Sequence, residues 1–309
     1  MCLMISAITI HFDPMTTLAE RNAHPRDSRI TFVEETHTYT LDGDASKNTS
    51  VTTFLHSLFP HFEPDVVISK MMKSKNWPKS PYFGRKPEDI KAGWEKSGSL
   101  AAEEGTKMHL NIENFYNGLP HETTSKEFKL FQEFVKDHNN YSIFRTEWVV
   151  FSKEAQICGS IDAVFEDPDE PGCFVIADWK RSKEVKMHNQ WENGTHPLTS
   201  HLPNANFITY SLQLSTYRYI LEKYYGLSIK KIPVLIILHP TQSVYRKIDT
   251  LDLRDVVEKL FEERIHGKQD SKLGHKENST TKSAKAVYVK PEEECMFDMS
   301  AITRSRNAM

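Results

Sequence analysis

The chain has few cysteines, and their spacing excludes the common cysteine-rich frameworks. Its 309 residues include four, Cys2, Cys158, Cys173 and Cys295, and none of them forms a Cys-x-x-Cys pair. Zinc and iron–sulfur sites need closely spaced cysteines, and disulfide frameworks are typical of much shorter secreted chains. The sequence therefore predicts buried, reduced thiols in an intracellular protein.

The chain also lacks a long apolar run and an excess of charge of one sign. The longest N-terminal apolar stretch, Leu3 to Ile10, is too short to span a bilayer, and no basic region precedes it as in a signal peptide. The formal net charge is −3, from 39 basic and 42 acidic residues. Binding to a polyanion would therefore need a local basic patch. We expect a soluble intracellular protein without membrane contact, while nucleus, mitochondrion, cytoplasm and a viral origin all stay open.

Glycine and proline are not abundant either, at 12 and 15 residues, which excludes collagen-like and low-complexity chains. Patterning divides the chain into a loosely held arm over 1–28, a hairpin and helical region over 29–98, a main core over 99–266, and a polar tail over 267–309 that we expect to be disordered. Alternation from Ile30 to Thr40 predicts the hairpin. Ser50 and Pro64 suit the starts of two short helices, the second running to about residue 75.

The core contains helices first and strands afterwards. Helical spacing over 88–117 is interrupted by Gly98 and Gly105, which predicts two helices or one kinked helix. Further helices are expected over 125–138, 204–225 and 252–265. Strands are expected over 142–151, 156–166, 173–181, 231–238 and 244–248. This order predicts an α/β or α+β fold in which helices flank a mixed central β-sheet.

Two aspartates and a lysine lie on the consecutive strands 156–166 and 173–181. Asp178 and Lys180 share a strand face, and a hairpin can bring Asp162 opposite Asp178. Neighbouring carboxylates repel each other unless a cation neutralises them, and such a pair suits magnesium. The alternative is a simple Asp178–Lys180 ion pair with the other aspartate in a turn.

Polar pairs on two of the helices extend this pattern. His109 and Glu113 are four residues apart and share a helical face, as do Gln213 and Tyr217. Each pair has a plainer interpretation, because a helical histidine is commonly a packing residue and a Gln–Tyr pair commonly forms hydrogen bonds at the edge of a core.

In combination these pieces resemble the PD-(D/E)XK nuclease superfamily, whose core is restriction-endonuclease-like. The order is a glycine–histidine helix, the Gly159-Ser160-Ile161-Asp162 strand, the Asp178-Trp179-Lys180 strand and the Gln213-x-x-x-Tyr217 helix. The closest likeness is to the RecB-type branch, which includes the mitochondrial genome-maintenance exonuclease, and it covers about residues 100 to 240. Ile161 stands where the superfamily has a proline, as is common in this branch. The cysteines do not match the iron–sulfur cluster of several RecB-type members.

The resemblance implies roles for particular residues. Asp162, Asp178 and the main-chain carbonyl of Trp179 would bind Mg²⁺ or Mn²⁺, and Lys180 would orient the attacking water or offset phosphate charge. His109 would bind metal or phosphate. Glu147 is either a further ligand or a solvated strand residue. Gln213, Tyr217 and Glu113 would contact substrate. The implied activity is hydrolysis of DNA phosphodiester bonds by an exonuclease acting on single strands or ends in replication, repair or recombination.

Two basic stretches suit a DNA partner, although solvated surfaces carry lysines too. The first stretch interleaves basic and aromatic residues: Lys70, Lys73, Lys75, Trp77, Lys79, Tyr82, Arg85 and Lys86. The second stretch is Lys180, Arg181, Lys183 and Lys186. Alternatives to the exonuclease are a catalytically silent nucleic-acid-binding module on the same fold, a structure-selective endonuclease, and a non-nucleolytic protein whose motifs coincide by chance. The sequence points to no particular protein partner.

Overall fold

The computed structural model describes residues 16–33, 36–46 and 48–274. Its centre is a six-stranded mixed sheet in the order β3 (Thr49–Ser50), β5 (Ile157–Glu166), β6 (Phe174–Lys180), β7 (Val234–Ile237) and β8 (Arg246–Asp249). The long strand β4 (Ser142–Ser152) pairs with β5 along its whole length. The expected mixed sheet is confirmed.

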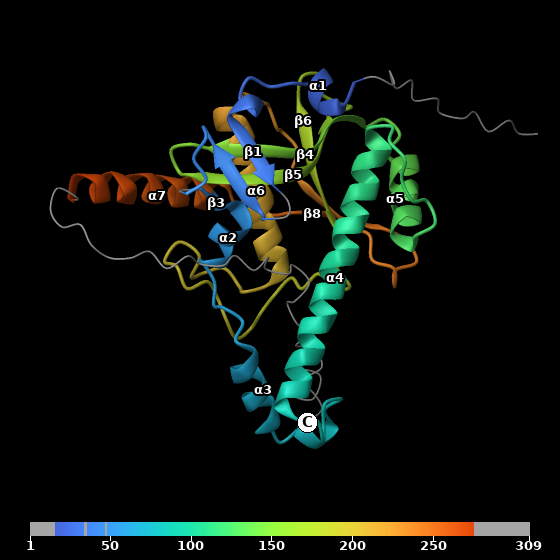
Figure 1. Cartoon of the computed structure of the whole chain (residues 1–309), viewed down its shortest axis with the longest axis vertical. Coiled ribbons are helices and arrows are strands. Elements are labelled where there is room, and N and C mark those ends of the chain that lie inside the picture. Colours follow the sequence, from blue (N-terminus) through green and yellow to red (C-terminus); the bar gives the residue numbers. More distant parts are fainter. Residues whose placement is uncertain (1–15, 34–35, 47, 275–309) are drawn as a thin grey trace, which may run out of the picture.

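Helices cover both faces of this sheet (Figure 1). On one face, α4 (Pro87–Tyr116) and α5 (Lys126–Asp137) pack on an aromatic cluster in which Phe131 and Phe134 surround Trp179. On the other, α6 (Asn206–Tyr224) and α7 (Arg254–Gly274) enclose a second cluster that includes Ile220 and Phe261. The sheet therefore has two buried faces, and any polar group on it must find partners inside the protein.

β5 has an uneven edge, and this positions the site. β4 occupies one edge of β5, so β3 and β6 must share the other. β3 pairs with Ile157 and Cys158, whereas the registered pairs with β6 begin at Ala163. The stretch Gly159–Asp162 lies between these two partners. On this edge, no registered partner from the described strands lies beside the stretch, so its polar side chains have room to contact groups from other elements.

The hairpin predicted near the N-terminus is formed by β1 (Ile30–Val33) and β2 (Thr38–Leu41). Before it lie α1 (Leu18–Arg21) and the 3₁₀-helix η1 (Asp27–Arg29), which the weak sequence pattern did not indicate. Long-range polar contacts hold this segment on β4: Asp27 is 2.8 Å from the Arg145 guanidinium and accepts a hydrogen bond from the Trp148 indole. Residues 16–28 are thus tied to the core, while 1–15 lie outside the described residues.

Of the two alternatives expected from Gly98 and Gly105, the structure excludes two separate helices, because α4 is one helix of 30 residues. An interior glycine costs a helix only about 1 kcal/mol. Tertiary packing at both ends offsets this cost: Ile90 and Trp94 pack in the first half, and Met108 and Ile112 pack on the sheet in the second.

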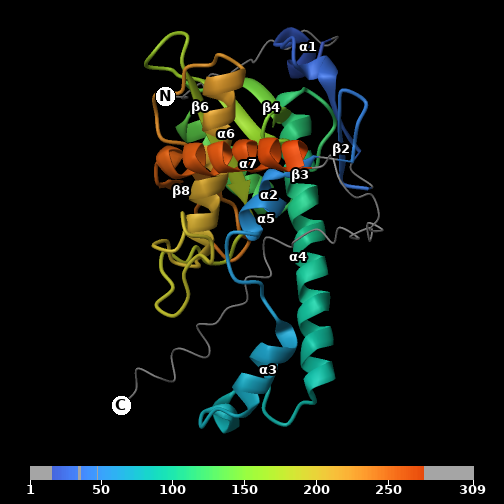
Figure 2. The same cartoon turned by 90° about the vertical axis from the view of Figure 1, so that its left-hand side faces the viewer.

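A projection, called the arm from here on and distinct from residues 1–28, extends beyond the sheet (Figures 1 and 2). It consists of α3 (Pro64–Met72), the 3₁₀-helix η2 (Trp77–Lys79) and the first half of α4. The chain leaves the core through α2 (Val51–His56), capped by Ser50 as predicted, and continues into α3 and η2. A small apolar cluster holds the arm together. Its buried members are Ile68, Met71, Ile90 and Trp94, with Trp77 and Tyr82 packed against them.

The C-terminal helix α7 continues to Gly274, beyond the predicted end at residue 265. The remainder of the predicted tail, 275–309, lies outside the described residues. Cys158 and Cys173 are buried free thiols as expected, while Cys2 and Cys295 lie outside the described residues.

Candidate functional site

Strand register brings three carboxylates to neighbouring positions on β4, β5 and β6. Thr146 pairs with Ala163 and Trp148 with Ile161, so Glu147 falls opposite Asp162. Ala163 pairs with Ala177, which places Asp178 at the next step across from Asp162. The hairpin expected from the turn at 167–172 therefore aligns the two aspartates.

Glu147 has an unusual backbone conformation. Its φ is +42°, in the left-handed region, which costs a residue with a side chain roughly 1–2 kcal/mol. Its carboxylate accepts a hydrogen bond from the Ser160 hydroxyl at 3.1 Å and lies against His109 of α4. Strained residues of this kind cluster at functional sites, so the conformation marks Glu147 as a functional candidate.

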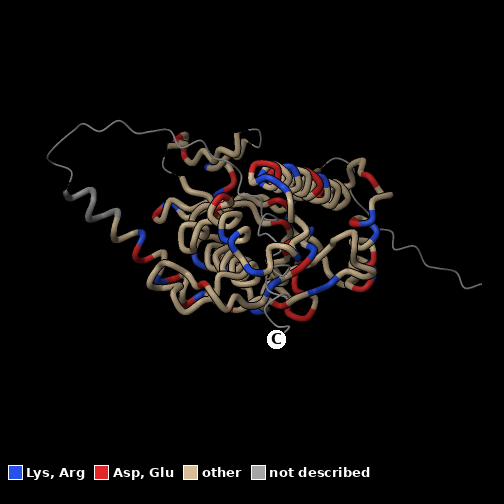
Figure 3. Tube along the Cα trace, turned by 90° about the horizontal axis from the view of Figure 1, so that it is seen from below, with Lys and Arg blue, Asp and Glu red and all other residues tan. Residues whose placement is uncertain are grey.

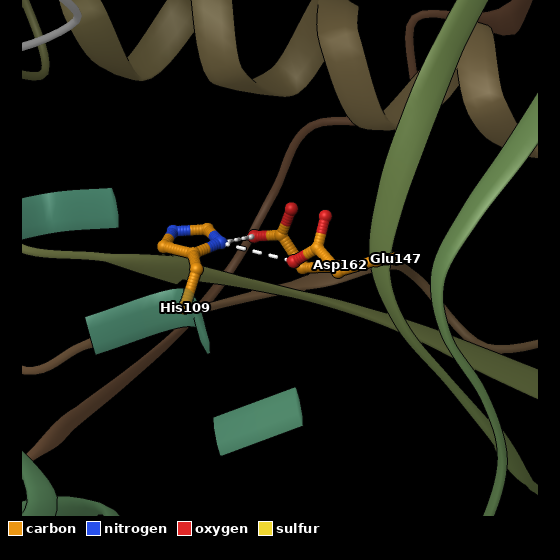
Figure 4. Close-up of side chains that lie close together, drawn as sticks. All are labelled: His109, Glu147 and Asp162. Atoms are coloured by element: carbon orange, nitrogen blue, oxygen red, sulfur yellow. Dashed lines mark hydrogen bonds and ion pairs between the residues drawn. The ribbon is translucent and has the colours of Figure 1, made fainter. Parts of the chain in front are cut away.

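His109 projects from α4 toward the sheet and contacts residues of β4, β5 and β6 (Figure 4). Its Nδ1 lies 3.2 Å from Glu147 Oε1 and 3.7 Å from Asp162 Oδ2. Its Nε2 lies 3.0 Å from the main-chain oxygen of Trp179. A carbonyl oxygen only accepts, so Nε2 is the donor in that contact.

Burial and neighbouring charges shift the pKa values of His109 and Asp162. Burial lowers the pKa of His109, but the carboxylates of Asp162 and Glu147 outweigh it and raise the pKa to about 10. Burial, followed by the negative charge of Asp178, raises the pKa of Asp162 well above its usual range. The site thus has more carboxylates than the single His109 imidazole can neutralise, which favours the binding of a cation.

Asp178 and Lys180 form a buried ion pair beside this cluster. Lys180 Nζ lies 3.0 Å from Asp178 Oδ2, and their side chains are 6% and 2% exposed. The ammonium also lies 5.1 Å from the ring centre of Tyr210 on α6. The ion pair considered as the plainer alternative is therefore present, but Asp162 is not in a turn: it lies on β5 and accepts a hydrogen bond from the Trp179 amide at 2.8 Å.

Gln213 and Tyr217 line the buried side of α6 and are joined by a side-chain hydrogen bond. Burial raises the pKa of Tyr217, and Tyr39, Asp162 and Asp178 raise it further. A Cβ built on Gly159 would lie 2.8 Å from the Tyr217 hydroxyl. The glycine of the Gly-x-Ile-Asp motif thus leaves room for the tyrosine of the Gln-x-x-x-Tyr motif.

The structure does not gather every predicted residue into this cluster. Glu113 lies one turn beyond His109, yet the carboxylate that contacts the imidazole is Glu147. Trp77 and Tyr82 pack into the arm, and Arg85 and Lys86 are exposed there. Their contact with substrate stays a prediction.

Two neighbours of the site were not singled out from the sequence. Ser160 orients Glu147, and Tyr210 lies over Lys180. Ser160 stands inside the Gly-x-Ile-Asp motif. Because it is two residues from Asp162 on the same strand, the two side chains lie on one face of the sheet, and this spacing could have indicated its role.

The donor set fits a divalent cation. One ligand atom each from His109, Glu147 and Asp162 can be chosen so that all lie within 4.8 Å of one another. Two carboxylates suit Mg²⁺ and Mn²⁺, and an imidazole favours the transition metal of the two. The Trp179 carbonyl, expected as a ligand, accepts a hydrogen bond from His109, and its contact with a metal stays a prediction.

Comparisons with known proteins add little. No family model and no curated protein matches the chain. Among solved structures, one described as "Crystal structure of SSO0001" has 13% sequence identity over 73% of this chain and 78% of that chain, with a TM-score of 0.28. That likeness is too small to bear on function. Within residues 16–33, 36–46 and 48–274, no helix is long and apolar enough to cross a membrane.

Proposed function

We propose that the chain is a metal-dependent DNA nuclease of the PD-(D/E)XK type that hydrolyses phosphodiester bonds. The observation that carries the proposal is the convergence of His109, Glu147 and Asp162 beside the buried Asp178–Lys180 pair. An ion pair needed only for structure would not require three further ionisable groups at one point on the sheet.

Each group has a place in the proposed hydrolysis. Glu147, Asp162 and the Nδ1 of His109 would hold Mg²⁺ or Mn²⁺, which supplies Lewis acidity and a more acidic water. Lys180 offsets the negative charge that builds on the scissile phosphate, and Asp178 and Tyr210 fix its position. Water oxygen bonds to phosphorus as one P–O ester bond breaks, and the leaving sugar oxygen takes a proton.

The arm supports a substrate with a free end. It leaves the core at α2 and returns along α4, the helix that carries His109 (Figure 2). The segment after β6 is tied to the base of the arm, where the Thr199 hydroxyl donates to the Leu58 carbonyl at 3.0 Å. We infer that the arm and this segment restrict access from the side, so that a strand end reaches the site more easily than a closed duplex does; this favours an exonuclease.

The proposal is tested with the purified full chain and three DNAs of equal length: a linear single strand, a closed single-stranded circle and a linear duplex. Cleavage of the linear strand should require Mg²⁺ or Mn²⁺ and stop on chelation, and Ca²⁺ should support binding with little turnover because it is a poorer activator of water. Equal loss of the circle would replace the exonuclease with an endonuclease. Activity that survives exhaustive chelation would contradict the metal-dependent mechanism.

A further inference from the structure

Basic side chains from three separate segments gather where the parallel strands β6 and β7 end. Arg181 follows the last residue of β6, His239 lies just after β7, and Lys126 is the first residue of α5. Lys183 lies two residues beyond Arg181. The carboxyl ends of parallel strands are where α/β sheets generally bind ligands. The proposed hydrolysis uses none of these four side chains.

Contacts within the protein hold the group together. The Arg181 guanidinium lies 2.8 Å from Glu127 of α5, and both side chains are largely buried. The Leu238 amide donates to the Lys180 carbonyl at 2.9 Å, and the Gln242 side chain donates to the Lys183 carbonyl at 3.4 Å. The segment after β7 therefore lies against the segment after β6, with α5 beside them.

Basic side chains gather here, although the whole chain is slightly acidic. Figure 3 shows basic and acidic residues interspersed over the molecule. At this point, however, burial and then the charge of Arg181 lower the pKa of His239, Glu127 raises it, and Lys183 and Lys126 lower it further. Three permanent cations, Arg181, Lys126 and Lys183, thus act on His239 together with the carboxylate of Glu127. Lys126 and Lys183 are exposed and form no ion pair with another described residue.

We propose that Lys126, Arg181, Lys183 and His239 form a phosphate-binding surface that holds the backbone of single-stranded nucleic acid next to the scissile phosphate. The proposal rests on the proposed function for the identity of the polyanion. Arg181 lies two residues beyond Trp179, whose carbonyl contacts His109, and this is a distance of about 7 Å along a strand. Arg181 is fixed by Glu127, while the two lysines are free to follow a flexible backbone. His239 is a neutral donor beside them.

The test is equilibrium binding of a labelled oligothymidylate, followed by fluorescence anisotropy in Ca²⁺ over a range of salt concentrations. The variant is Lys126→Gln with Lys183→Gln. The matched control removes the same charge at two exposed lysines elsewhere, Lys136→Gln with Lys259→Gln. A third protein, Lys126→Arg with Lys183→Arg, keeps the charge. Thermal unfolding of all three checks that they fold.

The double glutamine variant should bind several-fold more weakly, and its slope of log Kd against log salt should fall by about 1.4, since a single strand releases about 0.7 counterions per neutralised phosphate. The control and the arginine variant should bind as the unmodified chain does. The proposed phosphate-binding surface would be contradicted by any of three results: equal losses in the control and the glutamine variant, an unchanged slope, or no binding by the unmodified chain. Selective loss of binding in a chain that cleaves no nucleic acid in any divalent metal would instead leave the surface standing and reject the proposed nuclease.

Discussion

The Nε2 of His109 lies 3.0 Å from the main-chain oxygen of Trp179, and this single contact fixes which ring nitrogen faces the carboxylates. Because the carbonyl accepts the Nε2 hydrogen, Nδ1 is left to face Glu147 and Asp162. Metal-binding histidines commonly donate their second N–H to a carbonyl or carboxylate in this manner, which orients the ring. The ring orientation therefore suits a metal site in which Nδ1, once it has released its proton, is a ligand.

The first prediction concerns the choice of metal. An imidazole adds more affinity for Mn²⁺ than for Mg²⁺, since Mg²⁺ prefers oxygen ligands. His109→Ala should therefore weaken Mn²⁺ binding more than Mg²⁺ binding in isothermal titration calorimetry. His266→Ala, at an exposed position on α7, is the control. Equal losses for both metals would remove His109 from the ligand set.

The second prediction concerns Ser160, a positioning residue. Its hydroxyl holds Glu147 at 3.1 Å, and loss of such a partner of a metal ligand typically lowers metal affinity 10–100-fold. Ser160→Ala should show a loss of this size in Mn²⁺ affinity, while the free energy of unfolding of the metal-free protein changes little. Ser160→Thr, which keeps the hydroxyl, should restore part of the affinity. Full Mn²⁺ affinity in Ser160→Ala would mean that the backbone alone positions Glu147.

The third prediction separates catalysis from stability at Asp178 and Lys180. Removing one partner of a buried ion pair leaves an uncompensated charge, which costs about 3–5 kcal/mol. Asp178→Ala and Lys180→Ala should each lower the free energy of unfolding by about this amount in chemical denaturation as well as abolish cleavage. The double variant Asp178→Asn with Lys180→Met leaves no unpaired charge and should be more stable than either single variant. A double variant that cleaves DNA would show that neither group is needed for the chemistry.

The fourth prediction concerns Gly159, where an added Cβ would meet the Tyr217 hydroxyl at 2.8 Å, the Tyr217 ring carbon Cε1 at 2.9 Å and Val51 Cγ2 at 3.2 Å. Overpacking of this kind typically costs about 1–3 kcal/mol. Gly159→Ala should lower the free energy of unfolding accordingly, and Tyr217→Phe in the same chain should recover part of the loss by removing the hydroxyl. Gly267→Ala on α7 is the control, since nothing lies within 4 Å of its Cβ. An undiminished stability in Gly159→Ala would show that Tyr217 moves freely.

Some parts of this arrangement were accessible from the sequence, and the reason lies in local signals. Asp162 and Asp178 were placed opposite each other because strand alternation and a strong turn at 167–172 fix that hairpin. Ser50 marked its helix through capping. These features depend on residues close together in the chain.

Other parts depend on tertiary packing and were not accessible. The contacts of His109 with Glu147 and Asp162 depend on the register of β4 on β5 and on the positive φ of Glu147. The continuity of α4 through Gly98 and Gly105 depends on apolar contacts at its two ends. The packing of Trp77 and Tyr82 in the arm depends on the antiparallel approach of α3 and α4.

The central claim is that the carboxylates of this cluster hold the metal that hydrolysis requires, and Asp162 tests it most directly. It is 10% exposed and contacts both His109 and the Trp179 amide, and asparagine has nearly the same shape. Single-turnover cleavage of a 5′-labelled linear single strand in Mn²⁺ should fall by several orders of magnitude in Asp162→Asn, as expected when a metal ligand is lost. Asp249→Asn, at an exposed position on β8, should cleave at the unmodified rate. Cleavage by Asp162→Asn at the rate of the unmodified chain would contradict the account.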